Sequence, residues 1–176
     1  MPGFNISSGF QNQKNSVSEP RRKHRWIMET LGPLTPTEAL YLQKASRPSF
    51  KYDEVEMHHD QEKAYFAGKQ EWEAMALGWY DIEQDPDVSE AVAKWLNIIT
   101  TNFLNVGNLT GVALPSAYKK EAKLSMTSGE QGSVNESWTL YNCWPSTTNW
   151  GDLDYTTSDI AMIEMTLRFD RAVRTL

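Results

Sequence analysis

The segment YKKEAKLSM, residues 118–126, alternates between two kinds of side chain along its whole length. Successive residues of a β-strand point to opposite faces of a sheet, so this period of two predicts a strand with one face against a core. The two faces would be Tyr118, Lys120, Ala122, Leu124 and Met126 on one side and Lys119, Glu121, Lys123 and Ser125 on the other. The segment therefore predicts a sheet protein.

Strand patterns recur on both sides of this segment. We expect further strands at residues 26–31, 39–45, 51–59, 72–80, 134–144 and 160–170. In the last of these, Ile163, Met165, Leu167 and Phe169 would face the core. The strand at 134–144 is expected to end in a turn at Trp144-Pro145, because proline presets its own backbone and cannot donate to a ladder.

One amphipathic helix is predicted over about residues 86–102. Asp85 would cap its start, with Pro86 at the first helical position and Asp87 in the first turn. The apolar stripe consists of Val88, Val92, Trp95, Leu96, Ile99 and Phe103. Strands come in runs before and after this helix, which argues against a parallel α/β fold. The fold class expected is mainly β, a β-sandwich or barrel with one α-helix.

The chain has 176 residues and a net charge of -6, which fits one folded domain, here residues 23–176. Residues 1–22 lack aliphatic periodicity and are predicted to form a flexible or partner-ordered arm. The basic cluster Arg21–Arg25 is either a charged lead-in to the first strand or a phosphate patch. An acidic body argues against a protein that reads nucleic-acid sequence.

Targeting and membrane signals are not found in the sequence. No apolar run approaches the roughly 20 residues that span a bilayer, so no membrane association is expected. The N-terminus has no secretory pattern, and the single cysteine cannot form an intrachain disulfide. These features predict folding in a reducing cytoplasm.

Residues that could carry chemistry do not form a recognisable site. His58 and His59 are adjacent on a predicted strand and would point to opposite faces, which disfavours a shared metal. Cys143 has no histidine at a catalytic spacing, and the aspartates of residues 152–159 lack the order of a calcium loop. We therefore expect no enzyme activity, no metal and no cofactor.

Seven tryptophans are many for this length, and five of them sit in strand or helix patterns. The other two, Trp144 and Trp150, flank a polar stretch that is predicted to be a loop. Aromatic side chains around a loop suit docking on another protein as well as stacking on a sugar. A carbohydrate-binding β-sandwich that uses Trp144 and Trp150 is therefore an alternative function.

The order of these segments resembles the tail tube proteins of contractile-tailed bacteriophages. The resemblance lies in YKKEAKLSM, then SWTLYNCWPSTTNWGDLDY at 137–155, then DIAMIEMTLRFDRA at 159–172. Upstream, KASRPSFKYDEVEMHHDQEKAYFAGKQEWEAMALGWYD at 44–81 is similar to the family's long hairpin and the strand after it. DPDVSEAVAKWLNII at 85–99 stands where those proteins have their helix. The resemblance covers about residues 24–171.

The resemblance implies stacked hexameric rings whose strands join one ring-wide β-barrel around a lumen that passes the genome. We expect five charged side chains to face the lumen, namely Glu54, Glu56, Lys119, Glu121 and Lys123. A net acidic or mixed lumen would let DNA slide without sequence specificity. The alternative is that these side chains lie on outer, solvated faces of a sandwich.

Contacts between subunits are expected at the hairpin tip, where Tyr65 and Phe66 lie, and at Trp144 and Trp150. The implied partners are other copies of the chain and the sheath, baseplate or tube-initiator, tail terminator and tape-measure proteins. The implied location is the virion tail, after assembly in the host cytoplasm. A tube initiator or terminator, or a type VI secretion-like tube protein, is an alternative within the same structural class.

Overall fold

A computed structural model describes residues 21–36, 39, 41–60, 62–82, 87–100, 112–128 and 133–175. The predicted arm, the cap at Asp85-Pro86 and the helix end near Asn102 fall largely or wholly outside this range. The strands are β1 (Trp26–Leu31), β2 (Leu42–Ala45), β3 (Phe50–His59), β4 (Glu62–Trp72), β5 (Met75–Tyr80), β6 (Lys120–Thr127), β7 (Val134–Asn149), β8 (Met162–Arg168) and β9 (Arg171–Thr175). The helices are α3 (Val88–Ile99) and α4 (Pro115–Tyr118). The predicted fold class, mainly β, is confirmed.

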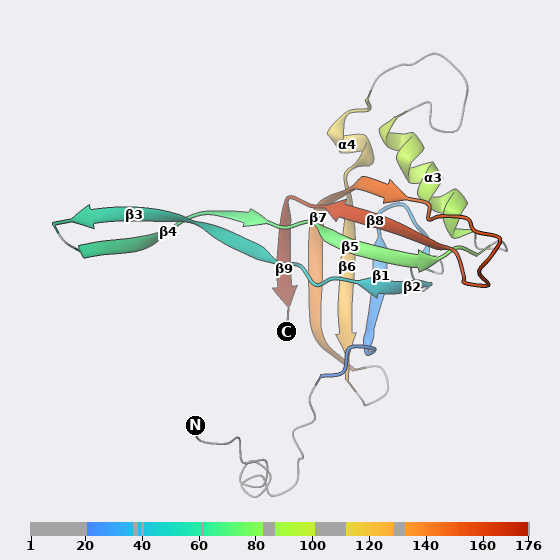
Figure 1. The fold of residues 1–176 in the computed structure, drawn as a ribbon, viewed down its shortest axis with the longest axis horizontal. Helices are drawn as coiled ribbons and strands as arrows, with labels where there is room; N and C mark the ends of the chain where they lie inside the picture. The colour runs from blue at the N-terminus through green and yellow to red at the C-terminus, as the bar shows by residue number, and fades with distance from the viewer. Residues whose placement is uncertain are drawn as a thin grey trace, which may run out of the picture.

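Two antiparallel sheets cross in the body of the molecule (Figure 1). We name β1-β6-β7-β9 sheet A and β7-β8-β5-β2 sheet B. The strands of sheet A run nearly vertically in Figure 1 and those of sheet B nearly horizontally. Strands β3 and β4 pair only with each other and form a long hairpin outside both sheets. The body is therefore an orthogonal sandwich.

Strand β7 belongs to both sheets because it bends in the middle. Its first part pairs with β6 and β9, and the part from Trp144 to Asn149 pairs with β8. At the bend Asn142 has φ 59°, and the register shifts between Pro145 and Thr147. The predicted turn at Trp144-Pro145 is therefore wrong: the strand continues through a bulge, one of the few places in a sheet that tolerate proline.

The core lies between the two sheets and α3. Trp79 and Trp95 are completely buried. The core-facing residues that were predicted in the last strand, Ile163, Met165, Leu167 and Phe169, are all buried. Gly32, at φ 57°, ends β1 beside the Trp95 ring, and a Cβ there would lie 2.7 Å from ring carbons. The predicted stop of the first strand at Gly32 is therefore confirmed, with a steric reason.

Helix α3 is shorter than predicted. Asp87 is its N-cap, since the side chain accepts a hydrogen bond from the Glu90 N–H at 2.9 Å, and Thr100 is its C-cap. The assignment of the cap to Asp85 was wrong because Asp87 has an extended backbone and only Val88 begins the helix. Phe103, the last residue of the predicted apolar stripe, lies outside the described residues.

Three further differences concern short elements. Strand β2 begins at Leu42 instead of Ala39, whose N–H bonds the Thr35 carbonyl in a helical turn. Helix α4, which begins with Pro115, was not predicted, although proline at the first position favours a helix start. The predicted strand at 160–170 corresponds to β8 alone, and β9, which follows it and pairs with β7, was not predicted.

Candidate assembly interface

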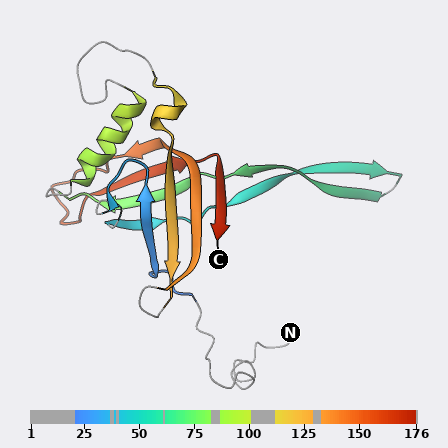
Figure 2. The same ribbon diagram turned by 180° about the vertical axis from the view of Figure 1, so that it is seen from behind.

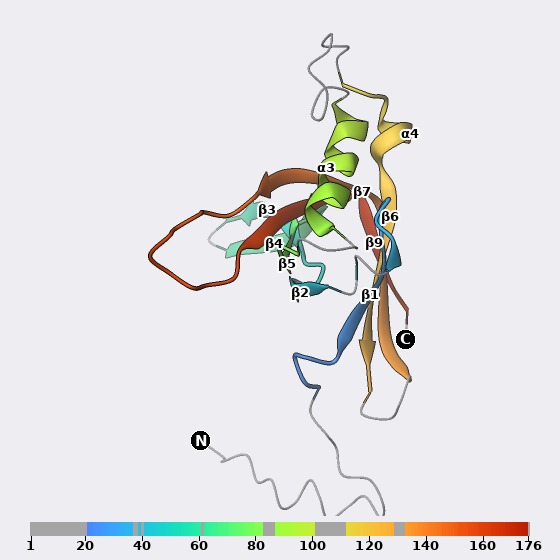
Figure 3. The ribbon, with the colours of Figure 1, turned by 90° about the vertical axis from the view of Figure 1, so that its right-hand side faces the viewer.

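One face of sheet A is not covered by the described part of the chain. Figure 3 shows this sheet edge-on, with sheet B and α3 on one side only, and Figure 2 looks onto the open face. Cross-strand pairs on this face are Ser125 with Ser137 and Lys123 with Thr139. Ser137 and Thr139 are half-buried there, whereas Ser125 is completely covered by its neighbours.

The open face carries one ion pair, besides the exposed charges of Glu121 and Arg171. The Lys123 ammonium lies 2.6 Å from the Glu29 carboxylate, and Ser125 donates a hydrogen bond to the same carboxylate. Hydrogen bonds from Lys123 and then Ser125 hold the pKa of Glu29 below its usual value, against a smaller opposing effect of burial. Glu29 is thus ionised at neutral pH, and it neutralises one cation of the face.

The five side chains predicted to face a lumen do not lie on one surface of the subunit. Glu121 and Lys123 are on β6 in sheet A, whereas Glu54 and Glu56 are on the outlying hairpin. Lys119 is not in the strand: it caps α4 and lies 2.8 Å from Asp170. The lumen role of all five stays a prediction.

The sequence reasoning missed other polar residues of this face. Glu29, Ser137 and Thr139 flank Lys123 and Ser125 across the strand pairs. The sequence contained a pattern that could have identified them, because Ser137 and Thr139 alternate with the core-facing residues of β7. It was overlooked because Glu136, a buried charge, interrupts the apolar positions of that strand.

The outer edges of sheet A are β1 and β9, and within the described residues neither edge pairs with a further strand on its outer side. Each of the neighbouring pairs β1-β6, β6-β7 and β7-β9 is antiparallel, so β1 and β9 run in opposite directions. An unpaired strand edge presents free backbone donors and acceptors. A β9 edge placed beside the β1 edge of a second copy in the same orientation would form an antiparallel pair.

The β3–β4 hairpin projects past the β9 side of the body, as Figures 1 and 2 both show. Every described side chain from Lys51 to His58 is exposed. Residues directly opposite each other in an antiparallel pair share a face. One face of the outer hairpin therefore holds Val55 with Phe66 and Met57 with Ala64, and the other holds Glu54 with Ala67, Glu56 with Tyr65 and His58 with Lys63.

The hairpin is thus amphipathic although neither face is buried in the chain. Val55, Met57 and Phe66 are 52%, 54% and 52% exposed. On the opposite face Lys63 lies 3.4 Å from Glu56. Tyr65 and Phe66, which were predicted together as contacts, point to opposite faces. We name Val55, Met57, Ala64 and Phe66 the apolar hairpin face.

Of the two tryptophans that were expected on a loop, only Trp150 lies on one. Trp144 is in β7, half-buried, with its ring edge-on to Tyr118 at 6.2 Å between centroids. Trp150 follows β7 and packs partly against the core. Both side chains are partly buried, so neither is an open platform for stacking on a sugar, and the carbohydrate alternative gains no support from them. Leu153 and Tyr155 of the following loop are instead fully exposed.

A buried carboxylate joins the start of the described chain to β9. Glu136 is 3% exposed, and it accepts hydrogen bonds from Trp138 Nε1 at 2.6 Å and Arg174 Nη2 at 3.2 Å, together with a contact from Arg21. Burial by itself raises the pKa of Glu136, but these hydrogen bonds and the charges of Arg174 and Arg21 outweigh it and hold the pKa below its usual value. Arg21 of the basic cluster therefore has a structural partner.

Other groups with possible chemistry are isolated. Cys143 is fully buried, and burial raises the pKa of its thiol to about 12, so it is protonated at neutral pH. Among the described side chains no cluster suits a metal ion, and no described helix is long and apolar enough to cross a bilayer.

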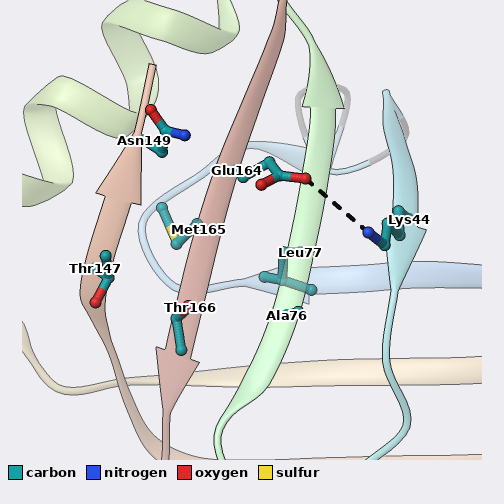
Figure 4. A pocket seen from close by; sticks show the side chains of 8 residues that line it. All are labelled: Lys44, Ala76, Leu77, Thr147, Asn149, Glu164, Met165 and Thr166. Carbon is teal, nitrogen blue, oxygen red and sulfur yellow. Dashed lines mark ion pairs between the residues drawn. The ribbon is translucent and has the colours of Figure 1, made fainter. Parts of the chain in front are cut away.

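A shallow depression on sheet B, shown in Figure 4, has a volume of about 190 Å³. Its ion pair joins Lys44 and Glu164 at 4.0 Å, and both side chains are more than half exposed. Thr147, Asn149 and Thr166 supply the other polar side chains of the lining. An exposed ion pair at this distance contributes little to stability, and the lining of the depression does not indicate a catalytic site.

Comparisons with known proteins agree with this geometry. Residues 35–173 match the family model of the T4-like virus tail tube protein gp19. A search of curated proteins found no match. Among solved structures, the anti-feeding prophage tube-terminating cap superposes with a TM-score of 0.69 at 22% identity, covering 94% of this chain and 97% of that one.

Two further similar structures come from an extracellular contractile injection system called PVC. Its sheath/tube terminator gives a TM-score of 0.68 at 20% identity, covering 92% of this chain and 100% of that one. A chain of its sheath-tube complex gives 0.65 at 21% identity, covering 90% and 93%. At these identities the likeness establishes a shared fold.

Proposed function

Because the chain belongs to the T4-like virus tail tube protein gp19 family, we propose that it is a structural subunit that assembles into stacked hexameric rings. The tube so formed would be the conduit for genome delivery. The single observation that carries this proposal is the pair of open, oppositely directed edges of sheet A. Subunits that join β9 to β1 would continue one antiparallel sheet around a ring and leave no free edge.

The open face of sheet A would line the lumen of this barrel. The core covers the other face of sheet A, so only the open face is available to line the inside of a closed barrel or to contact solvent. Hydroxyl groups and the Glu29–Lys123 pair would present little net positive charge to a phosphate backbone. Glu121 and Lys123 of β6 keep their proposed lumen role on this basis, whereas Glu54 and Glu56 lie on the hairpin, outside sheet A, and Lys119 precedes the strand.

The hairpin would be the contact that reaches furthest into a neighbouring copy. It projects on the β9 side, where the next subunit of the ring would stand. A two-stranded hairpin is marginally stable alone, and half-exposed Val55, Met57 and Phe66 gain free energy when a partner covers them. The apolar hairpin face would therefore be buried in the assembly, with Glu54, Glu56 and Tyr65 directed away from that contact.

Further partners are proposed from the assemblies to which the similar structures belong. Their names include a tube terminator, a sheath-tube complex and, for one more, a baseplate. We propose a surrounding sheath, a baseplate or tube initiator, a terminator and a tape-measure protein as partners here. The particle would assemble in the host cytoplasm and carry this protein in its tail.

A tube-terminating cap is a second candidate, since both the cap and the terminator structures share the fold over nearly the whole chain. The two functions differ in how far assembly proceeds. A tube subunit adds rings without limit, whereas a cap forms one ring and stops.

Negative-stain electron microscopy over a protein concentration series, with light scattering alongside, tests the proposal. Hollow tubes of uniform diameter and variable length are expected. Single rings at every concentration would favour the cap. Monomers alone, at every concentration, would contradict both assembly functions.

A further inference from the structure

A cavity of about 480 Å³ opens at one end of the body, between the two sheets. This end is where β1 begins and β6 finishes, the lower end of sheet A in Figure 1. Leu124 and Met126 form a buried floor. The full lining, which we name the socket, is Lys23, Trp26, Ala45, Arg47, Leu124 and Met126. The socket is thus an apolar recess with two cations at its rim.

The opposite end of sheet A carries an apolar projection. Figures 1, 2 and 3 all place α4 at this end, above the start of β6. Just before α4, Val112 is 72% exposed and Leu114 is 75% exposed. We name residues Val112–Pro115 the knob.

The backbone holds the knob in place. Val112 forms a β-bridge with Thr100, and the Ala113 N–H donates to the Ile99 carbonyl at 2.9 Å. Helix α4 begins directly after the knob, at Pro115. A contact made by this segment therefore costs little conformational entropy.

We propose that the knob of one copy inserts into the socket of a second copy, end to end along the strands of sheet A. This inference rests on the proposed function, in which rings stack into a tube. The occupant is a second copy because knob and socket lie at opposite ends of the same chain. A contact between two different patches of identical subunits repeats without closing when the copies are related by translation, which is what a growing tube requires.

Electrostatics favours the same pairing. Helix α3 ends beside the knob, and its last turn contains no basic residue. The final carbonyl groups of a helix carry a partial negative charge that nearby cations stabilise. Lys23 and Arg47 at the socket rim would supply those cations from the second copy, and Arg47 is already held over the cavity by a hydrogen bond to Met126 Sδ at 2.6 Å.

Cysteine cross-linking of the full chain tests the contact. Ala45→Cys marks the socket and Leu114→Cys marks the knob, while the native Cys143 is buried and protonated. The two variants are mixed, assembled and treated with a short bismaleimide. We expect a cross-linked dimer in the mixture at a yield at least about tenfold above either variant alone. Tubes that form in the mixture without this dimer would overturn the inference and leave the proposed function standing.

Two serine variants supply a matched comparison. Leu114→Ser should raise the concentration needed for tube growth by at least about tenfold while single rings still form. Leu153→Ser removes a leucine that is even more exposed, at 92%, in the loop between β7 and β8, and should leave tube growth unchanged. Equal effects of the two substitutions would overturn the inference. If the unmodified protein formed neither rings nor tubes, the proposed function would be wrong, and this inference with it.

A competing occupant is the protein's own N-terminal segment, which leads into the socket at Lys23. Deletion of residues 1–20 separates the two. If the deletion increases the reactivity of Ala45→Cys in the monomer several-fold, the N-terminal segment fills the socket and the inference is wrong. Unchanged reactivity in the monomer, with protection appearing only in tubes, supports the second copy.

Discussion

The body and the hairpin of this protein are both built from antiparallel strand pairs, but only the body buries its apolar side chains within the chain. In the body, both sheets and α3 bury a common set of apolar side chains, so the strands are stabilised within the chain. In the hairpin, β3 and β4 pair over their whole length but every described side chain from Lys51 to His58 remains exposed. Hydrogen bonding alone does not make a stable unit in water, because water competes for the same groups. Within the described chain the body is stabilised by its own core, whereas the apolar side chains of the hairpin stay exposed, as the proposed assembly contact requires.

The largest change in monomer stability is expected for a substitution at the centre of the body. Trp95 is completely buried, and its Nε1 donates to the Tyr118 carbonyl at 3.2 Å. Trp95→Ala should lower the free energy of unfolding of the monomer by about 3–5 kcal/mol, because it leaves a cavity and an unsatisfied carbonyl. Urea unfolding monitored by circular dichroism measures this. A loss below about 1 kcal/mol would show that the body does not depend on this core.

A smaller effect in the body is expected at Glu136, and it depends on pH. Glu136→Gln should cost about 1–3 kcal/mol at pH 7, because the charged partners Arg21 and Arg174 lose their carboxylate. A lowered pKa in the folded state means that the carboxylate stabilises the fold above its unfolded pKa, near 4.5, and that this stabilisation is lost as pH falls through the folded pKa.

The check is urea unfolding of both proteins from pH 7 to pH 3. The difference in unfolding free energy should be constant down to about pH 4.5 and should shrink below it. A difference that stayed the same to pH 3 would mean that the charge of Glu136 is not what stabilises the wild-type protein.

In the hairpin the same kind of substitution should act on assembly and not on folding. Phe66→Ser should leave the unfolding free energy of the monomer within about 0.5 kcal/mol of wild type. It should raise the concentration needed for assembly by about five- to tenfold, since a half-exposed phenylalanine is no longer buried against a partner. Sedimentation of assembled material over a concentration series measures the second quantity.

Tyr65→Ser is the matched control, because Tyr65 is the adjacent residue and is 59% exposed on the opposite face. It should leave the unfolding free energy of the monomer unchanged, within about 0.5 kcal/mol, and change the concentration needed for assembly by less than about twofold. If Tyr65→Ser impaired assembly as much as Phe66→Ser, the assignment of one contact face to the hairpin would be wrong.

The smallest effect is expected at Lys119. Its ion pair with Asp170 is partly exposed, and the hydrogen bond from Lys119 is the main reason that the pKa of Asp170 is lowered. Lys119→Met should cost less than about 1 kcal/mol of monomer stability and leave assembly unchanged. Altered passage or binding of DNA in tubes of this variant would support the lumen role that the sequence predicts for Lys119.

The sequence predicted the body better than the interface, and the reason is physical. Burial of one face of a strand makes every second residue apolar, and this pattern is visible in the sequence alone. It predicts the core-facing residues Ile163, Met165, Leu167 and Phe169 correctly. The bend of β7 arises because the strand pairs first with β6 and then with β8, which is distant in the sequence, so the local pattern around Pro145 predicts a turn instead of a bulge. The facing of Tyr65 and Phe66 depends on the register of the hairpin, which a single strand does not reveal.

In the proposed ring, β9 of one subunit pairs with β1 of the next. Hydrogen exchange measured by mass spectrometry, on monomers and on assembled tubes, tests it most directly, because pairing protects edge amides that are open in the monomer. We predict that peptides covering Trp26–Leu31 and Arg171–Thr175 both become strongly protected on assembly. Tubes in which the hairpin gains protection while both edge strands exchange as fast as in the monomer would contradict the claim.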